Sequence, residues 1–492
     1  MITSWRRLPP DLAAANSFRY HAQAMTLNNV KTRFAPSPTG YLHLGNVRTA
    51  LFSALLAQRW GGRFLLRIED TDPERSRSEY VSALLEDLRW LGLLWDEGPE
   101  VGGAHGPYAQ SQRTALYADY YQRLETKSRV YPCFCSVAEL ALSRKAQLAA
   151  GRPPRYSGVC GRLSGAEQRE RLQRGLQPTL RFRVPAGQAL TFTDLVRGPQ
   201  RFASDDLGDF VIRRADGTPQ FFFANAVDDA LMEVTHVLRG EDHLANTPRQ
   251  LLLLEALELP IPDYGHLALI VGADGGPLSK REGDLSLREL RAAGYLPKAL
   301  WNYLARLGHA YGRDHWLEPV QLAADFALER LGRAPARYDP TQLLHWQSEA
   351  VRHSPDDQLW AWMGNAVHQQ TPPTRREDFM TTVRPHVRFP ADAVFWAERW
   401  FGPNPRPSAE GQALLAAAGS AYFRDALAAY AMHGAAYQLL IDELKQRTGL
   451  KGKNLFMPLR VALTGETHGA ELARILELLP PETVEQRLRA CA

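Results

Sequence analysis

The first part of the chain alternates short apolar runs with segments whose apolar residues follow helical spacing. Residues 30–34 and 63–68 predict strands, and residues 47–58 predict a helix between them. A second helix is indicated by apolar residues at Val81, Leu84, Leu85, Leu88 and Leu91. This strand–helix–strand–helix order predicts a parallel sheet covered by helices.

The pattern changes at about residue 111, where an arginine-rich, cysteine-bearing segment with short alternating runs begins. Beyond this segment the first pattern returns, with strands expected at 221–226, 234–238 and 266–271 and a helix at 248–257. From about residue 286 helical spacing predominates, broken by proline-rich stretches.

We therefore expect an α/β multidomain protein with a Rossmann-like, doubly wound core, an inserted domain and all-α domains at the C-terminal end. The expected parts are a leader (1–29), two core halves (30–110 and 221–275) around the insertion (111–220), a connecting region (276–345) and a helical region (346–492).

The hydrophobic pattern excludes a membrane protein, because no stretch approaches the ~18 apolar residues of a spanning helix. The net charge is only +4, but residues 144–201 hold twelve Arg and Lys against three acids. This segment suits a polyanionic partner such as nucleic acid, or it is a solvated basic face.

Four cysteines in 492 residues cannot form a disulfide scaffold, which favours a reducing cytoplasm. Residues 1–29 contain no apolar segment of the secretory type. We expect a leader that is disordered or, with translation starting at Met25, not translated, in preference to a targeting peptide.

A proline-containing loop at 35–40, followed by His43, Gly45 and Asn46, lies between the first strand and the first helix. A helix N-terminus offers free N–H groups and the positive end of a dipole to a phosphate. Gly45 would let a nucleotide approach the backbone, and His43 can hydrogen-bond a phosphate oxygen. The short H-x-G motif is weak alone and becomes specific when joined to the preceding loop.

Residues 272–284 form a Gly-rich loop that carries Lys280 and Arg281. Such a mobile loop can bring Lys280 onto the charge that develops in a phosphoryl or nucleotidyl transfer. By itself the segment would be interpreted as a surface turn with two solvated cations.

Together the two loops resemble the paired signature of class I aminoacyl-tRNA synthetases, and the surrounding sequence looks like the glutamyl-tRNA synthetases of that family. The similarity runs from Thr32 to Gly465 and includes LRIEDTD at 66–72, THVLRGED at 235–242, NTPRQ at 246–250 and MPLRVALTG at 457–465. Glutaminyl relatives carry a glutamate in the first loop and β-barrels in place of the C-terminal helices.

The resemblance implies adenylation of glutamate by ATP, release of pyrophosphate and transfer of the acyl group to the terminal adenosine of tRNA(Glu), for protein synthesis. It implies ATP and Mg²⁺ as cofactors, tRNA(Glu), L-glutamate and ATP as partners, no membrane, and a monomer in the cytoplasm. The reaction needs positioning and charge stabilisation, so no general base is expected.

The resemblance also implies residue roles. Arg33 and Arg239 are candidates for the side-chain carboxylate of glutamate, which an arginine fork suits, and Glu69 is the candidate for its ammonium group. The other glutamate-site candidates are Ala35, Ser37, Phe221 and Asn225. The ATP-site candidates are His43, Gly45, Asn46, Asp242, His243, Lys280 and Arg281, with His43 and Lys280 as the catalytic pair.

Three positions depart from the family pattern. Pro277 replaces the first lysine of the mobile loop, and Phe221 replaces a tyrosine that usually faces the amino acid. Gln342 and Gln347 stand where the family usually has Lys and Asn, so tRNA contacts near them are expected to differ.

Cys133, Cys135, Tyr156 and Cys160 are similar to a zinc pattern of some relatives. No histidine occurs between His105 and His236, so the common Cys₃His set cannot form here. A structural zinc and a knuckle of three small buried thiols are the two alternatives.

Two other functions stay open at this point. A tRNA-modifying relative that attaches glutamate to queuosine shares the core, but it normally lacks the long helical half. A catalytically impaired tRNA-binding paralogue is suggested by Pro277 and Phe221. The sequence does not decide whether tRNA(Gln) is also charged.

Overall fold

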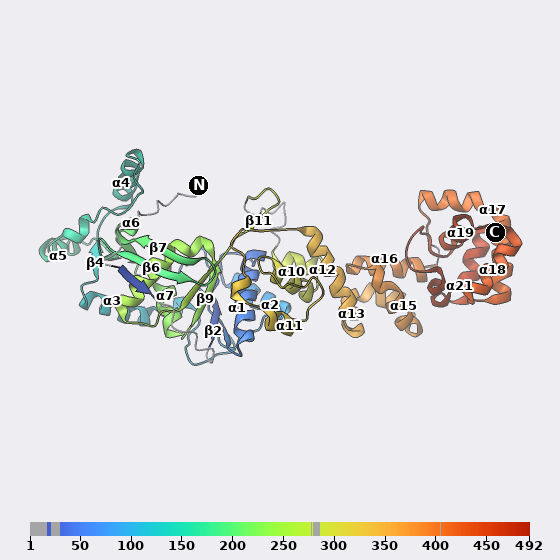
Figure 1. The fold of residues 1–492 in the computed structure, drawn as a ribbon, viewed down its shortest axis with the longest axis horizontal. Coiled ribbons are helices and arrows are strands. Elements are labelled where there is room, and N and C mark those ends of the chain that lie inside the picture. The colour runs from blue at the N-terminus through green and yellow to red at the C-terminus, as the bar shows by residue number, and fades with distance from the viewer. Residues whose placement is uncertain (1–16, 21–29, 277, 279–285, 404) are drawn as a thin grey trace. The chain divides into compact units, whose positions relative to one another are not determined.

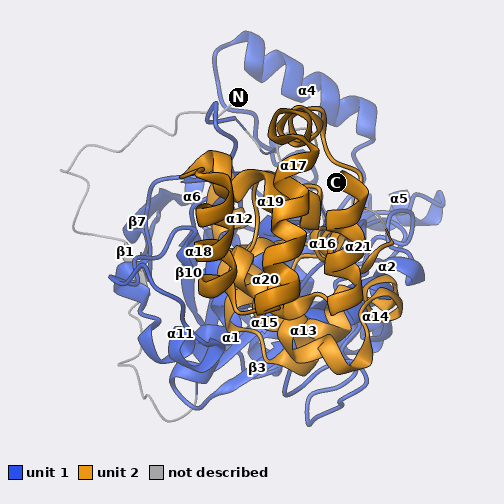
Figure 2. Ribbon diagram, turned by 90° about the vertical axis from the view of Figure 1, so that its right-hand side faces the viewer, with its two compact units in different colours: residues 1–289, 301–340 blue, residues 290–300, 341–492 orange. Residues whose placement is uncertain are grey.

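The computed structural model describes residues 17–20, 30–276, 278, 286–403 and 405–492. They form two compact units, one within residues 1–289 and 301–340 and the other of residues 290–300 and 341–492 (Figure 2). Among the described helices, none combines the length and the apolar character needed to span a bilayer.

A four-stranded parallel sheet lies at the centre of the first unit (Figure 1). Its strands follow the order β10 (Asp263–Leu267), β9 (His236–Gly240), β2 (Lys31–Phe34) and β3 (Arg63–Leu66). Thr32 in β2 pairs with Phe64 on one side and His236 on the other. Strand β2, the first strand of this sheet along the chain, therefore lies in its interior, and later strands are added on both sides. This order confirms the doubly wound core.

Helices cover both faces of this sheet. Thr32 faces α1 (Leu44–Arg59), because its hydroxyl donates to the Ser53 carbonyl at 2.7 Å. Side chains alternate along a strand, so Leu65 and Val237 point to the opposite face, where they pack with Leu251 of α8 (Thr247–Leu257). A further helix, α2 (Ser78–Leu91), follows β3 as expected.

Two predicted strands differ in the structure. Residues 221–226 begin helix α7 (Phe221–Leu231), and the strand prediction was wrong because a short, mostly apolar run suits a buried helix as well as a buried strand. The expected strand at 266–271 is divided between β10 and β11 (Ile270–Val271). The latter pairs with β12 (Ala336–Arg337) and not with the central sheet.

The insertion contains an antiparallel sheet of β4 (Val130–Cys133), β5 (Thr179–Phe182) and β8 (Phe210–Arg213). A hairpin of β6 (Ala189–Asp194) and β7 (Gly198–Ala203) follows β5. The helices of the insertion are α3 (Thr114–Thr126), α4 (Val137–Ala149), α5 (Gly165–Gln173) and α6 (Ser204–Leu207), with the 3₁₀ turn η2 (Val159–Arg162). Within the expected leader, Ser17–Tyr20 form β1, parallel to β6, and the other leader residues lie outside those described.

After β11 the chain continues through α9 (Leu287–Ala292), α10 (Pro297–Arg306) and α11 (Pro319–Asp325). The second unit is helical, as expected, and its core contains Phe379, Trp400 and Phe423. Its helices are α12 (Pro340–His353), α13 (Asp356–Met363), α14 (Asn365–Gln370), α15 (Arg376–Val383), α16 (Pro390–Phe401), α17 (Ala409–His433), α18 (Tyr437–Thr448), α19 (Lys453–Thr464), α20 (Leu472–Leu478) and α21 (Pro481–Cys491).

Candidate active site

A cavity of about 490 Å³ opens at the carboxyl ends of β2, β3 and β9. This edge of a doubly wound sheet is where ligands bind. Its wall includes all seven predicted glutamate-site residues and five of the predicted ATP-site residues: Arg33, Ala35, Ser37, Glu69, Phe221, Asn225 and Arg239, then His43, Gly45, Asn46, Asp242 and His243. Segments about 200 residues apart in sequence therefore meet at one cavity.

The N-terminus of α1 forms one side of the cavity. His43 caps the helix, since its Nδ1 accepts from the Gly45 N–H at 3.2 Å and its own N–H donates to Asn46 Oδ1 at 3.4 Å. A Cβ on Gly45 would lie 3.0 Å from His43 Cε1, so a larger residue would displace the ring. Glycine at this position allows the histidine cap and a close approach to the helix N–H groups.

A buried cluster of opposite charges forms part of the floor. Arg33 donates to both oxygens of Asp229, through Nε at 3.3 Å and Nη2 at 3.5 Å. Arg67 donates to Asp229 Oδ1 at 2.7 Å and to Glu69 Oε1 at 2.8 Å. Because Asp229 already balances Arg33, Arg239 is the stronger candidate for an added carboxylate.

Two amide side chains, Asn225 and Gln250, link Glu69 to Arg239 across the floor of the cavity. Asn225 donates to Glu69 Oε1 at 2.6 Å and accepts from Gln250 at 2.7 Å, and Gln250 Oε1 in turn accepts from Arg239 Nη2 at 2.7 Å. Arg239 Nη1 is buried and has no hydrogen-bond partner among the described residues. An unpaired buried guanidinium nitrogen in a cavity wall suits an incoming anion.

Burial sets the ionisation of this floor. It raises the pKa of Glu69, against the opposing pull of Arg67. It lowers the pKa of Arg239 to about 10, so the guanidinium stays protonated at neutral pH. The cavity therefore offers a cation at Arg239 and a carboxyl group at Glu69.

The other wall comes from the start of α7 and from the 3₁₀ turn η3 (Glu241–Asn246). The Phe221 ring lies against the His243 ring, with centroids 5.3 Å apart. Burial, with the nearby positive charge of Arg239, lowers the pKa of His243, which favours a neutral imidazole. Asp242, beside it, is exposed.

Three predicted loop positions, Pro277, Lys280 and Arg281, lie outside the described residues. The role of the Lys280 loop stays a prediction.

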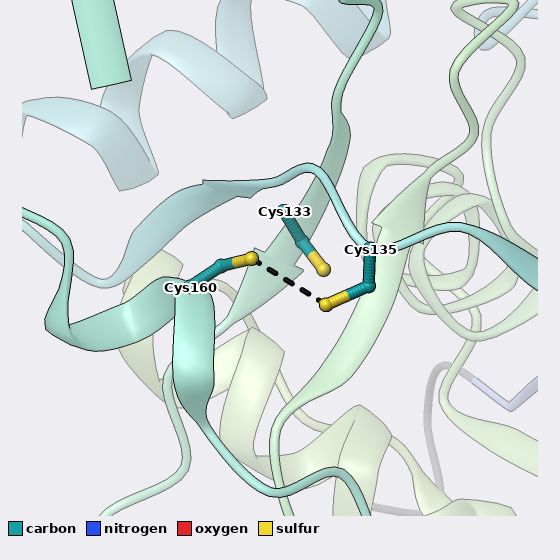
Figure 3. A group of neighbouring side chains, drawn as sticks. All are labelled: Cys133, Cys135 and Cys160. Carbon is teal, nitrogen blue, oxygen red and sulfur yellow. Dashed lines mark hydrogen bonds between the residues drawn. The ribbon is translucent and has the colours of Figure 1, made fainter. Parts of the chain in front are cut away.

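The cysteine group of the insertion comes together at the end of β4 and in η2 (Figure 3). The three Sγ atoms lie within 4.8 Å of one another, and the Tyr156 hydroxyl is 3.4 Å from Cys133 Sγ and 3.5 Å from Cys135 Sγ. Burial opposes ionisation of Cys133, but hydrogen bonds from Tyr156 and Arg181 lower its pKa to about 7. A tetrahedral zinc site places sulfurs about 3.7 Å apart, so this donor set fits such an ion.

Sequence reasoning missed the polar groups that hold the floor, above all Asp229, Gln250 and His266. Gln250 is the last residue of the NTPRQ motif at 246–250, but none of the three is among the site residues predicted from the sequence. No periodic pattern marks such residues, because their partners come from distant segments and meet only in the fold.

Comparisons with known proteins agree with this geometry. Residues 29–344 match the family described as tRNA synthetases class I (E and Q), catalytic domain. Residues 417–492 match an anticodon binding domain.

A "Glutamate--tRNA ligase 2" of Nitrosococcus oceani is 58% identical, over 95% of this chain and 99% of that protein. One of Coxiella burnetii is 53% identical, over 94% and 100%. The crystal structure of a glutamate tRNA ligase from Elizabethkingia meningosepticum, in complex with its amino acid, matches with a TM-score of 0.86 at 27% identity, covering 94% of this chain and 99% of that one. The chain therefore belongs to the class I tRNA synthetases of the glutamate and glutamine type, and within them to the glutamate–tRNA ligases.

Proposed function

We propose that this chain activates L-glutamate with ATP and attaches it to the 3′ end of tRNA(Glu) through a glutamyl-adenylate. The observation that carries the proposal is one cavity that joins the unpaired guanidinium nitrogen of Arg239, the Glu69 carboxyl group and the N-terminus of α1. These groups suit the side-chain carboxylate, the ammonium group and the phosphates of the two substrates.

In the first step, an oxygen of the α-carboxylate of glutamate forms a bond to the α-phosphorus of ATP. The bond from that phosphorus to the oxygen of the departing pyrophosphate breaks. Arg239, with Arg33 beside it, would hold the side-chain carboxylate, and Glu69 the ammonium group. Ser37, Asn225 and the backbone at Ala35 would complete the amino-acid site, and Phe221 would close it. Orientation of the reacting atoms supplies much of the acceleration in such a step.

The nucleotide would lie at the start of α1, against His43, Gly45 and Asn46, with Asp242 and His243 on the facing wall. Lys280 and Arg281 would bring positive charge to the departing pyrophosphate. Mg²⁺ bound to ATP would neutralise phosphate charge.

The test is ATP–pyrophosphate exchange with glutamate, with and without tRNA, together with acid-precipitable charging. We expect glutamate-specific exchange and charging, both lost in Lys280→Ala. Absence of exchange under every condition would instead support the catalytically impaired paralogue. Charging assays with purified tRNA(Glu) and tRNA(Gln) would define the acceptor range.

The anticodon-type match at 417–492 favours a tRNA ligase over the shorter queuosine-modifying relative. We further propose a monomer that works in the cytoplasm. Sedimentation with and without tRNA tests the first point, and fractionation of cells tests the second.

We also propose that Cys133, Cys135, Tyr156 and Cys160 hold a structural zinc ion. The close packing of three sulfurs and a hydroxyl supports this donor set. Zinc would fix the loop after β4 against η2 and thereby shape the basic insertion. Metal analysis should find about one zinc per chain, lost in Cys135→Ser and retained in Cys491→Ser. Equal metal content in both variants would leave the thiol knuckle as the explanation.

A further inference from the structure

The tip of the β6–β7 hairpin of the insertion is fixed by one buried carboxylate. Asp194 is 2% exposed, and its Oδ1 accepts from the backbone N–H groups of Val196 at 2.9 Å and Arg197 at 2.7 Å. The same oxygen accepts from the backbone N–H of His266 in β10 at 3.2 Å. Leu195 N–H also donates to the Tyr264 carbonyl of β10, at 2.8 Å. The insertion is therefore joined to the central sheet at the edge strand β10.

The second oxygen of Asp194 continues the chain of bonds toward the cavity. Its Oδ2 lies 2.5 Å from Nδ1 of His266, a fully buried side chain. The other ring nitrogen, Nε2, lies 3.1 Å from Nε of Arg239. A guanidinium group can only donate, so Nε2 must accept and Nδ1 must carry the proton that is donated to Asp194. Burial lowers the pKa of His266 to about 4, in agreement with a neutral ring.

The contacts of His266 belong to a set that holds Arg239 in one orientation. Arg239 Nη2 donates to Thr247 Oγ1 at 2.9 Å and to Gln250 Oε1 at 2.7 Å, and the guanidinium lies over the Tyr264 ring, 5.0 Å from its centroid. With Nε and Nη2 engaged, Nη1 is left for a ligand. The direction of Nη1 thus depends on the partner of Nε.

We infer that Asp194 and His266 are positioning residues that orient Arg239 for the side-chain carboxylate of glutamate. The insertion thereby contributes to the amino-acid site without touching the substrate. A second contact supports this link, because Arg197 at the hairpin tip pairs with Glu241 at the start of η3, the turn that carries Asp242 and His243. The inference rests on the proposed role of Arg239.

Asp194→Asn is the first test, because it changes chemistry with little change in shape. An asparagine can keep an oxygen toward the turn, but its NH₂ group then faces His266 and favours protonation at Nε2. That places two donors, Nε2–H and the Arg239 Nε–H, against each other. We expect the KM for glutamate to rise about tenfold, with the KM for ATP and kcat little changed. Asp209→Asn is the matched control, since Asp209 is another carboxylate of the insertion that accepts from a backbone N–H, that of Val184 at 2.8 Å, and its second oxygen accepts from the Tyr131 hydroxyl.

A pair of His266 variants separates orientation of Arg239 from simple filling of space. Gln can place an acceptor near the position of Nε2, whereas Asn reaches only the position of Nδ1. His266→Gln should therefore keep more glutamate affinity than His266→Asn, although both leave a smaller side chain. If thermal unfolding shows that Asp194→Asn does not fold, the difference in KM for glutamate between His266→Gln and His266→Asn tests the positioning role instead.

Arg239→Lys distinguishes failure of the inference from failure of the proposed site. If Arg239→Lys raises the KM for glutamate while Asp194→Asn and both His266 variants leave it unchanged, the positioning role is wrong and the glutamate site stands. If Arg239→Lys has no effect either, the assignment of Arg239 itself is wrong.

Discussion

Glu69 is buried between Arg67 and Asn225, and burial raises the pKa of its carboxyl group. The proposed contact with the ammonium group requires the carboxylate. Because the pKa is raised, protonation on acidification begins at a higher pH than for an ordinary glutamate. We expect kcat/KM for glutamate to fall as the pH is lowered through this raised pKa and to recover above it, since kcat/KM reports the free enzyme.

The measurement is the pH profile of glutamate-dependent pyrophosphate exchange, with Glu69→Gln as the comparison. The variant should have a low kcat/KM without that acidic limb. An identical limb in both proteins would assign the titration to another group.

At position 45, the lack of space for a Cβ atom favours glycine. Its missing Cβ leaves room for the His43 ring, which a methyl group would approach to 3.0 Å. Gly45→Ala should weaken the cap of α1 and raise the KM for ATP about tenfold, with a smaller effect on the KM for glutamate. Gly332→Ala is a suitable control, because the nearest atom to its added Cβ would be 3.6 Å away. Equal ATP affinity in both variants would contradict the role of the cap.

At the scale of elements, the sequence predicted what periodicity and motif order encode. The strands β2 and β3 and helices α1 and α2 follow from apolar spacing, and the residues of the cavity wall follow from matched motifs. Residues 221–226 could not be assigned this way. A helix that is buried on most sides is apolar on most sides, so its sequence lacks the 3.6-residue periodicity that separates a helix from a strand. The link from Asp194 through His266 to Arg239 was also out of reach, since it joins three segments distant in sequence.

Helix α7 is tied to the start of the insertion by a buried acid. Asp228 accepts from Arg113 at 2.7 Å, Gln110 at 2.8 Å and Tyr117 at 2.7 Å. Asp228→Ala would leave Arg113 without its buried counter-charge, at a cost of about 3–5 kcal/mol in the free energy of unfolding. Urea unfolding should show this loss, whereas Asp119→Ala on the exposed face of α3 should not. A midpoint unchanged in Asp228→Ala would show that the ion pair adds no net stability.

At the scale of the whole molecule, the two units are interleaved in sequence, because residues 290–300 belong to the second unit although 301–340 return to the first. Within the second unit, Gln347 binds this segment through Leu296 N–H at 2.9 Å and the Gly294 carbonyl at 3.3 Å. Gln347, one of the positions where the sequence departs from the family pattern, is fully buried and bonded to backbone. Trp362 also donates to the Gly294 carbonyl, at 2.9 Å.

This arrangement predicts how the helical unit behaves as a fragment. Residues 341–492 alone lack the segment 290–300, so Gln347 and Trp362 lose hydrogen-bond partners and the core surface that Leu296 covers becomes exposed. We expect a fragment with 290–300 joined to 341–492 by a flexible linker to melt at a higher temperature than 341–492 alone. Gln347→Ala in the linked fragment should lower its melting temperature part of the way toward that of 341–492 alone, because the amide then no longer binds Leu296 and Gly294. Equal melting temperatures for the two fragments would show that 290–300 contributes nothing to this unit and that the helical region folds independently from residue 341.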